Sequence, residues 1–166
     1  MLVLSVDPGL TGALSLIGAA GELLECLDLP VEDNGLMTGS TRRWTDAHAL
    51  VKAVRELSQR HEFAKECVIG AIERPIPMPS LPAQTIGSQF DTFGVVRGIF
   101  AAVLGGGNLR YVQPREWKKL YGIGNDKERA RSVVQALYPD APVKRVKDHN
   151  RAEAILIGRF VWKVAA

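Results

Sequence analysis

The sequence lacks the features that mark several classes of protein. Its two cysteines, Cys26 and Cys67, form no C-x-x-C pair and have no regular disulfide spacing, so a reducing, cytoplasmic setting fits best. No apolar run reaches the roughly 18 residues that a membrane span requires, and no membrane association is expected. The first residues show neither the charged start nor the cleavage site of a signal peptide. With 166 residues, the chain is too short for the two lobes of an actin-like ATPase.

The composition is that of one globular domain spanning residues 1–166. Hydrophobic residues make up 46% and charged residues 23% of the chain. The net charge is only +3, but residues 110–151 hold 11 lysines and arginines against 5 acidic residues. Such a local basic excess is typical of a surface that binds a polyanion such as nucleic acid, with a solvated helix face as the alternative.

The hydrophobic pattern predicts an α/β fold. Three short strands separated by glycine-containing turns indicate an antiparallel meander at 2–7, 13–17 and 22–29. Two further strands are reached through helices and are expected at 66–73 and 109–113. Helices are expected at about 45–60, 83–104, 114–120, 125–137 and 148–164, and a long loop at 30–43. This order predicts a five-stranded mixed sheet, three strands antiparallel and two parallel, with helices on both faces.

Three acidic residues stand where they can converge. Asp7 ends the first strand, Glu73 ends the fourth, and Glu153 adjoins the apolar face of the last helix. If the two strands are neighbours, the carboxylates gather, and cations would relieve their repulsion. Mg²⁺ prefers oxygen ligands, and a pair of such ions assists phosphodiester hydrolysis. Taken singly, Asp7 could be a turn residue before Pro-Gly, and Glu73 an exposed strand end.

Four segments together resemble the RuvC family of Holliday-junction resolvases, which has a ribonuclease H-like fold. They are LSVDPGLTGALSLI (4–17), IGAIERP (69–75), QPREWKKLYGIGNDKERA (113–130) and KDHNRAEAILIG (147–158). The last segment looks most like the phage and prophage branch, which would place the protein in the cytoplasm of a bacterial host.

The resemblance implies a homodimeric, Mg²⁺-dependent endonuclease, with Mn²⁺ able to substitute, that nicks two opposing strands of a four-way DNA junction symmetrically. It implies that Asp7, Glu73 and Glu153 are catalytic metal ligands. The family commonly has an aspartate three residues before the last acid, where this chain has Asn150. Asp148 or His149 could replace it, the histidine as a ligand or a proton relay.

The same resemblance implies a DNA-facing side. Lys118 or Lys119 would hold the scissile phosphate, Lys118 as a catalytic residue, while Trp117 is expected in the core. Further contacts with DNA are expected from Arg115, Lys127, Arg129, Lys144, Arg145, Lys147 and Arg151. Met78, in a proline-rich loop, could wedge between stacked bases or belong to a rigid surface loop. The helix at 83–104 is a candidate dimer surface, although its aromatic residues could equally pack on the sheet.

Three other functions stay open. The protein could cut branched or flap DNA more broadly, or it could bind junctions without cutting, with Asn150 marking a broken site. The D-P-G-L-T-G segment also resembles a phosphate loop of actin-like ATPases, but the short chain argues against this, and no nucleotide cofactor is expected.

Overall fold

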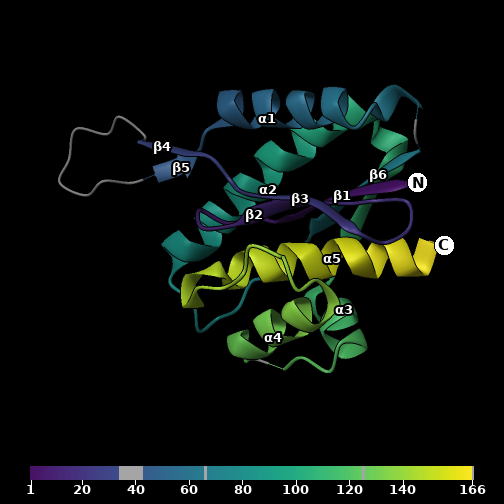
Figure 1. The fold of residues 1–166 in the computed structure, drawn as a ribbon. Coiled ribbons are helices and arrows are strands. Elements are labelled where there is room, and N and C mark those ends of the chain that lie inside the picture. Colours follow the sequence, from purple (N-terminus) through teal and green to yellow (C-terminus); the bar gives the residue numbers. More distant parts are fainter. Residues whose placement is uncertain (34–42, 66, 125, 166) are drawn as a thin grey trace.

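The computed structural model describes residues 1–33, 43–65, 67–124 and 126–165 (Figure 1). The strands are β1 (Leu2–Asp7), β2 (Ala13–Ile17), β3 (Leu23–Asp28), β4 (Val31–Asp33), β5 (Arg43–Thr45), β6 (Val68–Glu73) and β7 (Leu109–Val112). The α-helices are α1 (Ala47–Arg60), α2 (Ala83–Leu104), α3 (Pro114–Leu120), α4 (Lys127–Leu137) and α5 (His149–Ala165). The main elements therefore agree with the predicted ones to within about two residues at each end, the usual uncertainty of helix boundaries.

The main sheet has the strand order β3-β2-β1-β6-β7. β1 pairs antiparallel with β2, and β2 with β3, whereas β6 runs parallel to both β1 and β7. Helices α1 and α2 cover one face, and α3, α4 and α5 lie on the other (Figure 1). The predicted five-stranded mixed sheet between helices is confirmed.

Side chains alternate across β1 and divide the core into two layers. Leu2, Leu4 and Val6 face the α1 and α2 layer, while Val3 and the residues in step with it face α5. β6 alternates in the same way, because Ile72 packs in the first layer and Ile69 in the second. Residues at odd positions in both strands therefore look toward α5.

The prediction of one long loop over 30–43 is wrong at both ends. β4 and β5 form an antiparallel pair there, with Val31 opposite Thr45 and Asp33 opposite Arg43. Strands of three residues are too short to show an alternating pattern, so the sequence gave no signal for them. Residues 34–42 lie outside the described part of the chain.

Two details at helix starts differ from expectation. The expected N-cap of α4, Asn125, lies outside the described residues; Asp126 caps the helix by accepting from the backbone N–H groups of Glu128 and Arg129. The last helix starts at His149, preceded by a 3-10 turn over Val146–Asp148.

Among the described residues, no helix combines the length and the apolar character needed to cross a lipid bilayer.

Candidate active site

Asp7 is placed by the alternation of β1 and by the turn that follows it. It is in step with Val3 and Ser5, so it faces α5 at the end of the strand. The chain then turns sharply, with the Gly12 N–H donating to the carbonyl of Gly9 at 2.9 Å. A Cβ on Gly12 would lie 2.1 Å from the carbonyl oxygen of Asp7, so this turn requires glycine there.

Glu73 reaches the same place from the neighbouring strand. β1 and β6 are parallel, and Val6 lies opposite Ile72, so Asp7 and Glu73 follow one another's partners at the same edge of the sheet. Both side chains are in step with residues that face α5. The convergence predicted for two neighbouring strands therefore follows from register and alternation together.

Glu153 is supplied by α5, which is held tightly against the sheet. The hydroxyl oxygens of Ser5 and Ser15 lie 2.9 and 3.1 Å from the carbonyl oxygen of Ala154, and 2.7 Å from each other. One turn further, a Cβ on Gly158 would lie 2.5 Å from Ser5 Oγ, which shows how closely the helix approaches. The height and rotation of α5 are thus fixed directly beside Glu153.

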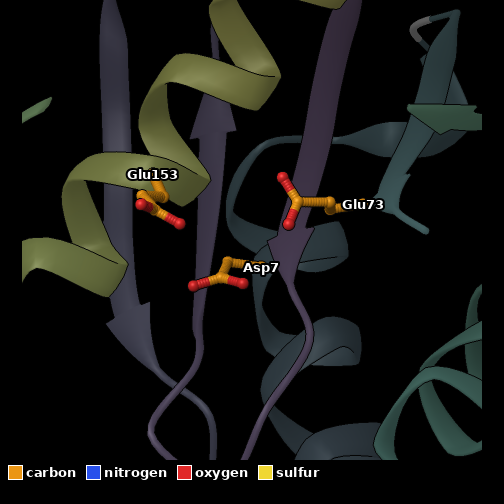
Figure 2. Close-up of side chains that lie close together, drawn as sticks. All are labelled: Asp7, Glu73 and Glu153. Atoms are coloured by element: carbon orange, nitrogen blue, oxygen red, sulfur yellow. The ribbon is translucent and has the colours of Figure 1, made fainter. Parts of the chain in front are cut away.

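Asp7, Glu73 and Glu153 form one cluster of carboxylates (Figure 2). One oxygen from each side chain lies within 4.8 Å of the others, and all three residues are at least partly buried. Elsewhere in the described ranges, no other group of three histidine, cysteine, aspartate or glutamate side chains meets the same distance test. A set of three carboxylate oxygens suits a hard divalent cation such as Mg²⁺ or Mn²⁺, which fits the expected cofactor.

The electrostatics of the cluster are strained in the way that such a cation would relieve. Burial, followed by repulsion from Glu153, raises the pKa of Glu73 to about 7, while a hydrogen bond from Trp117 and the charge of Lys118 oppose the rise. The Trp117 indole Nε1–H donates to Glu73 Oε2 at 2.5 Å. Lys118 Nζ lies 3.8 Å from Glu153 Oε1. The lysine therefore partly balances the clustered negative charge.

The candidates for a fourth ligand lie apart from this cluster. Asp148 is only 4% exposed, and its carboxylate accepts from both the backbone N–H and the guanidinium of Arg145. His149 Nδ1 lies 3.3 Å from the carbonyl oxygen of Val146. The Asn150 amide donates to the carbonyl and the hydroxyl of Thr11, at 2.5 and 2.8 Å. Asn150 thus ties α5 to the turn that follows Asp7.

The basic residues expected to face DNA fall into three groups. Those exposed to solvent are Arg115, Lys119, Arg129, Lys144 and Lys147. Two others form ion pairs, Arg145 with Asp148 and Arg151 with Asp28. Lys127 begins α4, and its side chain lies outside what the structure describes. In the proline-rich loop, Met78 is 52% exposed.

Several residues that shape the site were not singled out from the sequence. Trp117 is buried, as expected, but its bond to Glu73 was missed, although a buried indole N–H needs an acceptor. Ser5 and Ser15 are buried polar residues in apolar strands, and such residues also need partners. Nothing in the sequence indicated which partners these would be.

The chain was compared with known proteins. No protein family and no curated protein matched the sequence. Among solved structures, Thermus thermophilus RuvC in complex with a Holliday junction substrate is similar over 99% of this chain and 95% of that one, with 18% identity and a TM-score of 0.61. A second Thermus thermophilus RuvC structure is similar over 99% and 97%, with 22% identity and a TM-score of 0.58.

These similarities establish the fold. Nearly the whole chain has the arrangement of RuvC, a ribonuclease H-like fold, which confirms the predicted fold class and the resemblance to RuvC at the level of structure. Assignment to a phage or prophage branch stays a prediction.

Proposed function

We propose that this protein is a divalent-metal-dependent endonuclease that resolves four-way DNA junctions. The observation that carries the proposal is the carboxylate cluster of Asp7, Glu73 and Glu153 at one edge of a RuvC-like sheet. A structural neighbour with this fold is described in complex with a Holliday junction, which supports the same substrate here.

The proposed cofactor is Mg²⁺, with Mn²⁺ able to substitute. Asp7, Glu73 and Glu153 would hold it. When bound, a pair of such ions stabilises the attacking and leaving oxygens of a phosphodiester displacement. Lys118 lies beside the cluster and would hold the scissile phosphate, since its ammonium is within 3.8 Å of Glu153. Asp148 and His149 remain candidates for completing the ligand set only if the start of α5 rearranges.

The proposed DNA contacts come from the side of the sheet that carries α3, α4 and the start of α5. Arg115 and Lys119 lie on α3, Arg129 on α4, and Lys144 and Lys147 on the segment before α5. Contacts of this kind provide affinity and salt dependence with little base specificity. Arg145 and Arg151 would have to exchange an aspartate for a phosphate, and Lys127 and Met78 complete the proposed interface.

Symmetric nicking requires two sites, so we propose a homodimer. The outer side of α2 is a candidate surface, because Phe90 is 38% exposed and nothing lies within 4 Å of a Cβ built on Gly94. Phe93, in contrast, packs against the core and lies with its ring centroid 5.8 Å from that of Tyr111.

One observation favours a second candidate, a junction-binding protein that does not cut. Asn150 stands where the RuvC family commonly has an aspartate, and its amide is committed to Thr11. The three carboxylates that remain argue for the nuclease.

The test is cleavage of a synthetic four-way junction beside linear duplex and flap substrates, with Mg²⁺, Mn²⁺ or EDTA, for the wild type and Asp7→Asn. We expect metal-dependent, paired nicks in the junction that disappear in Asp7→Asn, while junction binding persists. Equal cutting of all three substrates would reduce the proposal to a general branched-DNA nuclease. Tight junction binding without any cutting would favour the non-cutting protein.

A further inference from the structure

The short helix α3 touches two of the three carboxylates in the cluster. Trp117 and Lys118 are adjacent on it, and they contact Glu73 and Glu153 respectively. The Lys118 ammonium also lies 5.2 Å from the centroid of the Trp117 ring. This helix therefore connects the two carboxylates that come from different layers of the fold, one from β6 and one from α5.

The position of Trp117 is rigidly determined. Its side chain has no exposed surface and packs in the core layer that contains Val112, Ile123 and Ile155. The start of α3 is fixed as well, by a proline at its first turn and by a capping box in which the Glu116 carboxylate accepts from the Gln113 N–H at 2.8 Å. A side chain held this way cannot follow movements of its hydrogen-bond partner.

Packing alone does not explain tryptophan at this position. A phenylalanine would fill much of the same apolar space, whereas the indole brings an N–H that must be satisfied once it is buried. In this protein the acceptor is Glu73 Oε2, at 2.5 Å, a short distance typical of a bond to an ionised group. The bond fixes one carboxylate oxygen and therefore the plane of the whole carboxylate.

We propose that Trp117 is a positioning residue of the cation site, whose indole N–H orients the Glu73 carboxylate toward Asp7 and Glu153. The inference rests on the proposed function, because it assumes that the cluster binds a divalent cation. Residues that hydrogen-bond to metal ligands in this way commonly contribute a large share of the affinity for the metal. Trp117 would thus link the packing of the core to the geometry of the site.

The test is the affinity for Mn²⁺ alone, measured by calorimetry with Trp117→Phe in an alkaline buffer in which Glu73 is ionised. Phenylalanine keeps a ring in the core and removes only the N–H donor and the second ring. We expect binding about 10–100-fold weaker than in the wild type. The matched control is Trp162→Phe, which also removes an indole donor, here bonded to the Ala19 carbonyl at 3.1 Å, and should leave Mn²⁺ affinity unchanged.

Unchanged Mn²⁺ affinity in a folded Trp117→Phe protein would overturn the inference, whatever the variant does to stability. Asp7→Asn separates this result from a failure of the proposed function. If Asp7→Asn does not weaken Mn²⁺ binding, the cation site itself is wrong. If Asp7→Asn weakens it and Trp117→Phe does not, only the role of Trp117 is wrong.

A second measurement covers the case in which Trp117→Phe does not fold. The indole N–H resonance of Trp117 can be followed by NMR in the wild type and in Glu73→Gln. We expect a downfield, exchange-protected proton that shifts on addition of Mg²⁺ and moves upfield in Glu73→Gln. A resonance that responds to neither change would overturn the inference.

Discussion

At the scale of single residues, Glu73 is the group whose environment departs furthest from that of an exposed carboxyl. It lies on a strand between two others, faces α5, and has Glu153 nearby, so burial and repulsion both raise its pKa. The raised pKa has a consequence for folding in the absence of divalent cations.

We predict that the metal-free protein loses stability as the pH rises through the interval between the ordinary Glu73 pKa of 4.5 and its folded value of about 7. In this interval the folded state holds a proton that the unfolded chain has released, so folding is favoured at the acidic end. A shift of this size corresponds to about 3 kcal/mol in the free energy of unfolding.

Denaturant unfolding in EDTA across this interval checks the prediction. Glu73→Gln, which cannot titrate, should lack the slope. Asp28 and Asp148 do not interfere, because their arginine partners lower their pKa values and their contribution is lost only at more acidic pH. A wild type as stable at the alkaline end as at the acidic end would contradict the account.

The site could be predicted from the sequence at this scale only in part. Asp7 and Glu73 each end an apolar strand, and alternation places both on the α5 side once the strands are paired. The hydrogen bonds from Trp117 to Glu73 and from Asn150 to Thr11 were not predictable, because each joins residues more than 40 positions apart. Such pairs depend on the tertiary arrangement and leave no mark on local pattern.

At the scale of elements, the site depends on how closely α5 approaches β1. The Ser5 and Ser15 hydroxyls bind the Ala154 carbonyl, and Gly158 allows the helix to lie against Ser5. The sequence predicted α5 and both strands, since their patterns are long and apolar. It did not predict the separation between them, which is set by a few small and polar side chains.

We predict opposite effects of alanine at two helical glycines. Gly158→Ala should destabilise the protein by about 1–3 kcal/mol, because the new methyl group would clash with Ser5 Oγ and with Ile17. Gly98→Ala in α2 is the control, since nothing lies within 4 Å of a Cβ there, and it should stabilise by about 0.5–1 kcal/mol.

Thermal and denaturant unfolding of the two variants measure this difference. Gly158→Ala should also weaken Mn²⁺ binding, because moving α5 moves Glu153. Equal effects of the two substitutions on stability would show that α5 has room to spare over the sheet.

At the scale of the whole molecule, charge and chemistry fall on the same side of the sheet. The basic segment 110–151 begins in β7, runs through α3 and α4, and ends in the first turn of α5, all beside or on the face toward which the three acids point (Figure 1). Because both helical layers pack on the one sheet, we also propose that residues 1–166 form a single domain.

The distribution of charge predicts which lysines contribute to DNA affinity. Lys144→Ala and Lys147→Ala should each weaken binding of a four-way junction in EDTA, and lower the slope of log affinity against log salt concentration by about one per phosphate contact. Lys52→Ala is the control, since Lys52 lies on α1 in the other layer and pairs with Glu56. Fluorescence anisotropy over a salt series measures the slopes, and equal slopes for all variants would refute the proposed interface.

The central claim is that Asp7, Glu73 and Glu153 together bind the divalent cation. The most direct measurement is anomalous X-ray diffraction from crystals grown with Mn²⁺, collected for the wild type and for Asp7→Asn. The account predicts an anomalous peak among the three carboxylates that is weakened or absent in the variant. Bound Mn²⁺ located elsewhere in the wild type, or an empty cluster at saturating Mn²⁺, would contradict it.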